Sequence, residues 1–125
     1  MAQQHVLLIE DEPHIAEAIR FILTRAGWRV SLHADGSDAV ARIRAEKPDV
    51  LILDLMLPGR SGFEILTDLR ADTVLADLPV LMLTARGQGR DRDAAERAGA
   101  SDFLAKPFAN ADVLAAVRRL AGEEA

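Results

Sequence analysis

The chain has 125 residues, half of them hydrophobic, and it contains no cysteine. This length suffices for one domain with a hydrophobic core and is too short for two, so we expect residues 1–125 to form a single domain. Twenty acidic residues against 15 basic ones give a net charge of −5, which argues against direct binding of nucleic acid. No apolar run reaches membrane-spanning length and the start "MAQQH" lacks the features of a signal peptide, so we expect a cytoplasmic protein with no membrane partner.

The first third of the chain has the pattern strand, helix, strand. The run Val6–Ile9 is entirely apolar, as in a strand buried on both faces. The segment after it has helical spacing, with Pro13 suited to the first turn and Gly27 to the C-terminal stop. The apolar positions of this helix follow the i, i+4, i+7, i+8 pattern: Ile15, Ile19, Ile22 and Leu23. In "WRVSLH" (Trp28–His33) apolar and polar residues alternate, which predicts an edge strand with one exposed face.

The rest of the chain repeats this alternation. Val50–Leu53 and Val80–Leu83 are apolar runs that predict buried strands, and Asp102–Ala105 predicts a short fifth strand. Asn110 is the expected N-cap of the last helix. Apolar residues with helical spacing mark three of the helices: Val40 and Ile43; Phe63, Leu66 and Leu69; Val113, Leu114, Val117 and Leu120. Five strand–helix units predict an α/β fold with a parallel sheet and helices on both faces.

The third apolar run contains a charged residue. In "VLILDLMLPG", Asp54 is the single polar residue between Val50 and Leu57, and the run ends at a Pro-Gly turn. Burying a carboxylate in a strand costs several kcal/mol unless another group pairs with it or coordinates it. The sequence therefore predicts that Asp54 has a charged partner or a metal ion beside it.

Polar residues also follow the other predicted strands. Glu10 and Asp11 follow the first strand, Thr84 follows the fourth and Lys106 follows the fifth. In an open parallel sheet, ligands bind beyond the carboxyl ends of the strands, at the point where the strand order reverses. If the first and third strands are neighbours at that point, these side chains converge on Asp54. Three carboxylates repel one another, so we expect Lys106 and a divalent cation, with Mg²⁺ the best fit, to offset the repulsion.

A carboxylate nucleophile, a hydroxyl, a lysine and a metal site are the parts needed to form and hydrolyse an aspartyl phosphate. Together with these residues, the ordered motifs "VLLIEDEP", "DLMLPG", "LTAR" and "DFLAKPF" resemble the receiver domain of bacterial two-component response regulators. The resemblance covers essentially the whole chain and implies a doubly wound (βα)5 fold with strand order 2-1-3-4-5. With "VRRL" near the end, the chain is most similar to receivers of the winged-helix transcription-factor class. We expect no effector domain in residues 1–125, so that the output would pass through protein–protein contact.

The resemblance implies a role for each residue of the acidic site. Asp54 would be the phosphoacceptor, and a sensor histidine kinase, a phosphotransfer protein or a small molecule would be the donor. Mg²⁺ would be bound by Asp11, by Asp54 and by the backbone carbonyl of Met56, and by Glu10 through water. Met56 and Arg86, each two residues beyond a site residue, are expected to influence the lifetime of the phosphoryl group.

The resemblance also implies a switch. Lys106 would pair with the phosphoryl group, and its bond to Pro107 is expected to be cis. Thr84 and Phe103 would be the switch pair: phosphorylation draws the hydroxyl inward, and the aromatic ring rotates into the space that it leaves. Phe103 stands where tyrosine is frequent in the family, so the ring is kept while a hydroxyl is lost.

The fourth helix, the fifth strand and the fifth helix form the output face in this family. The segment "GQGRDRDAAERAGA" offers only alanines to the core, so we expect the fourth helix to be locally the least stable. A downstream protein would bind this face, and a homodimer could form through it on phosphorylation. Such a module assists its own phosphorylation and dephosphorylation and is not an enzyme that turns over an external substrate.

Other functions fit the sequence less well. A phosphatase of the haloacid-dehalogenase type needs a second aspartate two residues after the first, where this chain has Met56. A pseudo-receiver usually lacks a site residue, and none is missing here. A nucleotide-binding fold would have G-x-G-x-x-G after the first strand, where this chain has "EDEPHI". The simplest alternative is that Asp54 is a structural acid paired with Lys106. The three histidines show no ligand spacing and are expected at the surface: His5, His14 and His33.

Overall fold

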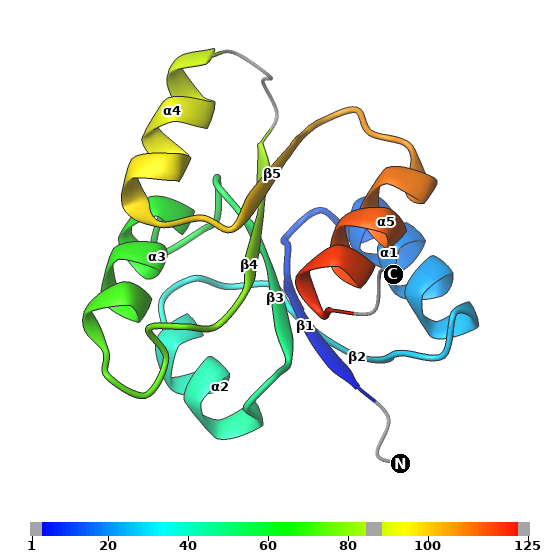
Figure 1. The fold of residues 1–125 in the computed structure, drawn as a ribbon, viewed down its shortest axis with the longest axis horizontal. Helices are drawn as coiled ribbons and strands as arrows, with labels where there is room; N and C mark the ends of the chain where they lie inside the picture. The colour runs from blue at the N-terminus through cyan, green and yellow to red at the C-terminus, as the bar shows by residue number, and fades with distance from the viewer. Residues whose placement is uncertain (1–3, 85–88, 123–125) are drawn as a thin grey trace.

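The structure, a computed structural model, describes residues 4–84 and 89–122. Its five strands are all parallel and form one sheet in the order β2-β1-β3-β4-β5. The strands are β1 (His5–Ile9), β2 (Arg29–His33), β3 (Val50–Asp54), β4 (Val80–Thr84) and β5 (Asp102–Ala105). The helices are α1 (Pro13–Arg25), α2 (Ala39–Glu46), α3 (Gly62–Ala71), α4 (Gly89–Ala98) and α5 (Asn110–Leu120). Helices α1 and α5 cover one face of the sheet and α2, α3 and α4 cover the other (Figure 1), which confirms the expected fold and strand order.

Strands β1, β3 and β4 are buried along their whole length, because each lies between two other strands and under helices on both faces. Successive side chains of a strand point to opposite faces of the sheet. In β3, Leu51 and Leu53 pack on the side of α2, α3 and α4, whereas Val50 and Ile52 pack on the side of α1 and α5. Burying one such side chain contributes about 1.5–3 kcal/mol. These apolar contacts fix the sheet and therefore the loops at its carboxyl edge.

Strand β2 forms one edge of the sheet. Its Val30 and Leu32 pack against the core on the α1 and α5 side, as the alternating pattern predicted. On the face that was expected to be exposed, only Arg29 is exposed, while Ser31 and His33 are partly buried. Trp28 was expected in this strand but precedes it. Its backbone N–H donates to the carbonyl of Leu23, 3.0 Å away, and its ring is buried. Trp28 therefore closes the turn after α1 and is not part of the strand pairing.

The surface position expected for His5 is wrong. The residue is only 3% exposed, and its Nε2 lies 2.7 Å from the Ser31 hydroxyl on β2 and 3.5 Å from Glu46. Its backbone N–H donates to Asp49 Oδ2 across 2.7 Å. Burial lowers the pKa of His5, the charge of Arg29 lowers it further, and the two nearby carboxylates only partly oppose them. The ring is therefore a neutral link between β1, β2 and the end of α2.

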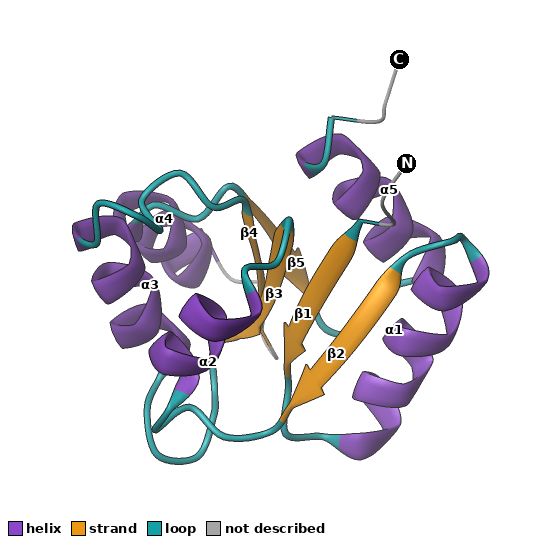
Figure 2. Cartoon of the chain, turned by 90° about the horizontal axis from the view of Figure 1, so that it is seen from below, coloured by secondary structure: helices purple, strands orange, loops and turns teal. Residues whose placement is uncertain are grey.

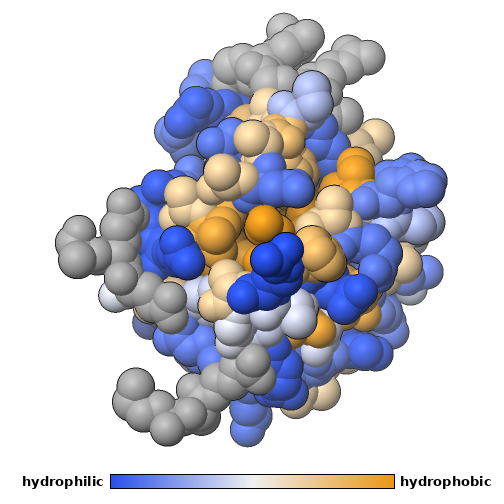
Figure 3. Space-filling model, turned by 90° about the vertical axis from the view of Figure 1, so that its right-hand side faces the viewer, coloured by the Kyte–Doolittle hydropathy of each residue, from blue (hydrophilic) through white to orange (hydrophobic). Residues whose placement is uncertain are grey.

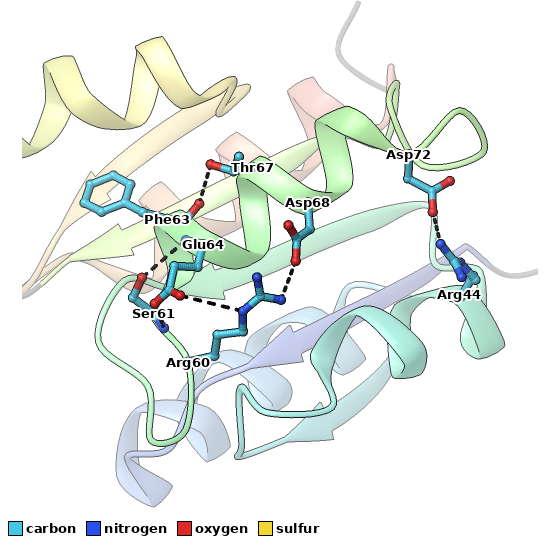
Figure 4. Close-up of polar contacts among 8 residues, drawn as sticks. All are labelled: Arg44, Arg60, Ser61, Phe63, Glu64, Thr67, Asp68 and Asp72. Carbon is cyan, nitrogen blue, oxygen red and sulfur yellow. Dashed lines mark hydrogen bonds and ion pairs between the residues drawn. The ribbon is translucent and has the colours of Figure 1, made fainter.

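Helix α3 has a well-defined start and several polar contacts along its exposed side (Figure 4). Ser61 and Glu64 form a capping box, in which each side chain accepts a hydrogen bond from the other residue's backbone N–H. Arg60 makes ion pairs with Glu64 and Asp68 on the same helix. At the other end of the helix, Asp72 pairs with Arg44 of α2. The capping box sets where α3 begins and so where the loop after β3 ends.

The expected N-cap of the last helix is wrong by one residue. Asn110 is the first residue of α5, and the extended residue before it, Ala109, occupies the cap position with no side-chain hydrogen bond. Helix α1 is capped differently: the Glu12 side chain accepts the backbone N–H of His14 across 3.1 Å, and Pro13 opens the helix. Glu12 thus ends the loop that carries the acidic pair.

One arginine ties α3 to the end of α4. Arg70 Nε donates to the Gly99 carbonyl at 2.8 Å, and its Nη1 donates to the carbonyls of Ala76 and Leu78 at 2.9 and 2.7 Å. Its Nη2 lies 3.4 Å from the Ser101 hydroxyl. Four carbonyl and hydroxyl oxygens from two loops are therefore held by a single side chain.

Candidate phosphoryl-acceptor and metal site

The candidate site lies at the carboxyl ends of β1 and β3, the two central strands between which the direction of strand order reverses. Glu10 directly follows β1, and Asp54 is the last residue of β3. Thr84 ends β4, and Lys106 directly follows β5. The arrowheads of the strands and the loops that follow them are at the lower side of Figure 2. The sheet thus brings to one edge the residues that the sequence singled out.

Three carboxylates meet at this edge. Glu10, Asp11 and Asp54 each present an oxygen within 4.8 Å of the others. Glu10 and Asp54 are both only 3% exposed, whereas Asp11 is exposed. One oxygen of Glu10 accepts the backbone N–H of Glu12 across 3.0 Å. The other, Oε1, is buried, and within the described residues its close polar contact is the ion pair with Lys106, so the cluster holds an anionic oxygen that a metal ion or its bound water can also contact.

Among the described residues, Lys106 supplies the positive charge beside the carboxylates. Its Nζ forms an ion pair with Glu10 Oε1, 2.8 Å away, and donates to Asp54 Oδ2, 3.2 Å away. Burial raises the pKa of Glu10, and the Asp54 carboxyl beside it raises it further. Burial works against the charge of Lys106, but its contacts with Glu10 and Asp54 prevail and raise its pKa. The Lys106 ammonium group therefore forms ion pairs with two buried carboxylates at once.

The orientation of the Asp54 carboxyl is fixed at both oxygens. Oδ1 accepts the backbone N–H of Met56 across 3.3 Å, and Oδ2 faces Lys106. The side chain of Met56 is 69% exposed, so this residue turns its backbone toward the site and its side chain toward solvent. Thr84 is buried at the end of β4, the strand that pairs with β3.

The remaining expected residues lie as follows. Phe103 of β5 is partly buried and packs against the core beneath α2, α3 and α4. The peptide bond from Lys106 to Pro107 is cis, which confirms that prediction. Arg86 lies outside the described residues. The structure thus brings together Glu10, Asp11, Asp54 and Lys106, while Phe103 lies on β5, two strands from Asp54.

An apolar groove borders the site on the side of α1 and α5. It encloses about 460 Å³ and is lined by Lys106, Pro107 and Phe108 after β5 and by Ile15 and Ala18 of α1, among others. Figure 3 faces this side of the molecule and shows apolar residues gathered in its centre with hydrophilic residues around them. Because Lys106 belongs to both the groove and the carboxylate cluster, a protein bound in the groove would also reach the site.

Sequence reasoning missed the loop between β2 and α2. The carbonyl of His33 accepts the backbone N–H of Glu10 at 3.0 Å, and the backbone N–H of Gly36 donates to the carbonyl of Pro58 at 2.9 Å. Small and acidic residues in "ADGSD" read as an ordinary surface turn, and their long-range contacts depend on a strand order that periodicity alone does not give.

A family model that describes the response regulator receiver domain matches residues 6–118. The chain belongs to the response regulator receiver family. It is 42% identical over 115 residues to the probable transcriptional regulatory protein TcrX of Mycobacterium tuberculosis, covering 92% of this chain and 48% of that protein. It is 36% identical over 115 residues to the phosphate regulon transcriptional regulatory protein PhoB of Escherichia coli, covering 92% of this chain and 50% of that protein. This receiver therefore spans about half the length of the curated relatives that it matches.

Solved receivers have the same fold. The receiver domain of the sensor histidine kinase PA1611 of Pseudomonas aeruginosa is 35% identical to this chain, with a TM-score of 0.88, and the match covers 97% of this chain and 99% of that one. That structure has a magnesium ion coordinated in its active site cleft. The chemotaxis response regulator CheY4 of Vibrio cholerae is 29% identical, with a TM-score of 0.88 over 95% and 99% of the two chains.

Membership of the family sets the broad function. Receiver domains act in phosphorylation-dependent signalling, interact with histidine kinases and downstream targets, and are not enzymes that turn over an external substrate. Within residues 4–84 and 89–122, no helix is both long and apolar enough to span a bilayer.

Proposed function

We propose that this receiver accepts a phosphoryl group on Asp54 and passes the signal to a partner protein. The observation that carries the proposal is the burial of Asp54 against Glu10 and Lys106 where β1 and β3 end. Two buried carboxylates that share one ammonium group are unfavourable for folding, because the cost of removing the charges from water can exceed their attraction, unless a bound ligand adds further favourable contacts to them. Because this destabilising arrangement stands at the binding edge of the sheet, a phosphoryl site explains it better than a structural ion pair does.

The carboxylates fit a divalent metal ion. Their oxygens lie within 4.8 Å of one another, a spacing that suits a hard cation with oxygen ligands, and a water molecule bound to such an ion would donate a hydrogen bond to Glu10 Oε1. We place Mg²⁺ on Asp11, on Asp54 and on the backbone carbonyl of Met56, with Glu10 reached through a water molecule. When bound, the ion neutralises negative charge on the phosphoryl oxygens.

The residues of the chain have distinct tasks in the transfer. An oxygen of Asp54 forms a bond to phosphorus while the bond from phosphorus to the donor's nitrogen or oxygen breaks, and the electron pair of that bond leaves with the donor. Met56 N–H and Lys106 hold the carboxylate in one orientation before the reaction. The Lys106 ammonium and the Thr84 hydroxyl then bind phosphoryl oxygens. The same groups would assist hydrolysis of the aspartyl phosphate.

The donor is a sensor histidine kinase or a phosphotransfer protein. A donor protein has to bring its phosphoryl group to Asp54, so it must contact a surface that is continuous with the site. The apolar groove that shares Lys106 with the site, between α1 and the start of α5, is the surface on which we place the donor. Kinases of this kind use ATP, and we therefore place the protein in the cytoplasm.

The output would leave through α4, β5 and α5. Thr84 and Phe103 stand on the neighbouring strands β4 and β5, so a movement of the hydroxyl toward a phosphoryl group opens space beside the ring. An ion pair between Asp102 and Arg119 joins β5 to α5 on this face. A downstream protein, or a second phosphorylated copy of the receiver, would bind here.

Intact-mass analysis after incubation with acetyl phosphate and Mg²⁺ tests the proposal. We expect a gain of one phosphoryl group that is lost over time and that is absent from Asp54→Asn and from a sample with EDTA. Borohydride reduction before peptide mapping would then mark the modified residue. The matched control is Asp49→Asn, a change of an acidic residue at the opposite end of β3, which should gain the same mass.

Two results would contradict the proposal. A mass gain that persists in Asp54→Asn would assign the phosphoryl group to another residue. No gain with the small-molecule donor or with a histidine kinase would favour a pseudo-receiver, in which the carboxylates are a metal or structural site only.

A further inference from the structure

The loop between β2 and α2, residues 34–38, links the two loops that carry the proposed metal ligands. Where the loop begins, the carbonyl of His33 accepts the N–H of Glu10 at 3.0 Å. Within the loop, the N–H of Gly36 donates to the carbonyl of Pro58 at 2.9 Å. Strand β2 pairs with β1 alone, so this loop has to extend beyond the end of β1 to reach the loop after β3 (Figure 2). We call the two contacting segments, residues 34–38 and 55–61, the β2–α2 loop and the β3–α3 loop.

The two loops touch backbone to backbone. A Cβ atom on Gly36, which is buried, would lie 2.4 Å from the carbonyl oxygen of Arg60, far inside the 3.0 Å that real Cβ contacts respect. On the opposite loop, Gly59 has φ +82°, and a Cβ there would lie 2.8 Å from Asp35 Oδ1. A side chain at position 36 would therefore push the two loop backbones apart, and one at position 59 would be strained by the positive φ and would push on the Asp35 carboxyl.

The shape of the β2–α2 loop is fixed from within. Asp35 Oδ1 accepts the backbone N–H of Ser37 at 2.7 Å, which closes a tight turn around Gly36. The N–H of Ala39, at the start of α2, donates to the Gly36 carbonyl at 3.3 Å. The position of Gly36 against the β3–α3 loop is therefore fixed by two contacts: the turn closed by the Asp35 side chain and the hydrogen bond to the start of α2.

We infer that the β2–α2 loop positions the metal site, with Gly36 and Asp35 as its positioning residues. The β3–α3 loop carries Met56, whose carbonyl is the proposed third ligand. The base of this loop is closed by the N–H of Gly62, at the start of α3, which donates to the Leu55 carbonyl at 2.8 Å. The contact with Gly36 holds the tip of this loop. The inference rests on the proposed function, because it concerns the Mg²⁺ of that site. Residues that orient metal ligands typically change metal affinity 10–100-fold when they are replaced.

Titration of the unphosphorylated protein with Mg²⁺ in a calorimeter, checked by competition with Mn²⁺ followed by electron paramagnetic resonance, tests the inference. In Gly36→Ala the added Cβ pushes against the Arg60 carbonyl, and we expect the Mg²⁺ dissociation constant to rise about 10-fold. The matched control is Gly27→Ala. Gly27 has φ +100° and open space around its Cβ position, so this variant loses stability without disturbing the site, and its Mg²⁺ affinity should be that of the wild type.

A second pair of variants keeps the test decisive if Gly36→Ala does not fold. Asp35→Ala removes the acceptor for Ser37 N–H and should weaken Mg²⁺ binding, whereas Asp35→Asn keeps an acceptor oxygen and should retain most of the affinity. Equal Mg²⁺ affinity in the wild type and in the folded Gly36 and Asp35 variants would overturn the inference and leave the proposed function intact. A wild type that binds no Mg²⁺ would instead overturn the metal site of the proposed function.

Discussion

Replacing Asp54 by asparagine should stabilise the metal-free protein, although it removes an ion pair with Lys106. At 3.2 Å that pair is worth about 5 kcal/mol at an effective dielectric of about 20. Glu10 and Asp11, with oxygens within 4.8 Å, each repel Asp54 by about 3.5 kcal/mol or more at the same dielectric. The two repulsions together exceed the attraction by about 2 kcal/mol before the cost of burying Asp54 is added, and the exposure of Asp11 reduces the difference.

We therefore expect Asp54→Asn to gain about 1–2 kcal/mol in unfolding free energy in EDTA, measured by urea denaturation at pH 7. Lys106 also forms an ion pair with Glu10, at 2.8 Å in the wild type, so its ammonium group still has a partner when Asp54 is replaced. Added Mg²⁺ should stabilise the wild type more than the variant, because the ion binds only the folded cluster. A variant that is less stable than the wild type in EDTA would refute the reasoning, since it would show that attraction to Lys106 outweighs the repulsion among the carboxylates.

Three further predictions concern the rest of the fold. Ser61→Ala breaks the capping box with Glu64 and should lower the unfolding free energy, measured in urea, by about 1 kcal/mol. The control Thr67→Ala, which removes an exposed hydroxyl from the same helix, should lower it by less. Equal losses of unfolding free energy in the two variants would contradict the role of the cap. Because the pKa of His5 is lowered in the folded state, its contribution to stability is complete above the unfolded value of 6.5 and is lost as the pH falls below it, with a slope of at most about 1.4 kcal/mol per pH unit. In His5→Gln, which can still bond Ser31, the curve of stability against pH should be flatter in that range, and an unchanged curve would assign the slope to other groups. Amide hydrogens of α4 should exchange faster than those of α1, because the described part of α4 buries little beyond alanine, and equal protection of the two helices would count against a weakly anchored α4.

The elements that the sequence predicted well are those whose signal is local. Runs such as Val50–Leu53 are apolar at every position because both faces are buried, and the Pro-Gly turn marks their end. Asp54 stood out for the same reason, since a charge in such a run needs a partner. The ordered motifs after the strands then pointed to the family, and through it to the strand order that the structure confirms.

The features that the sequence did not reveal depend on contacts between distant segments. His5 is buried because β2 and the end of α2 lie against it, and neither contact leaves a mark in the residues near position 5. Arg70 reads as an ordinary charged residue at the end of a helix, yet it is held by carbonyls of two loops. Gly36 reads as a turn residue, and only the approach of Arg60 shows why no larger residue fits. The N-cap prediction for Asn110 failed because α5 begins at Asn110 itself, and the residue in the cap position, Ala109, has no polar side chain that could signal a cap.

The hydrogen bonds from Arg70 fix the C-terminal end of α4 relative to α3. They hold the turn at Gly99 and Ser101, directly after the helix. A helix of this length measures about 15 Å, so a rotation of about 10° around the fixed end would carry the other end about 2.5 Å. After such a rotation, a partner protein that binds the N-terminal half of α4 would meet a binding surface displaced by about 2.5 Å. A partner that binds the Gly99 end would meet a surface that has hardly moved.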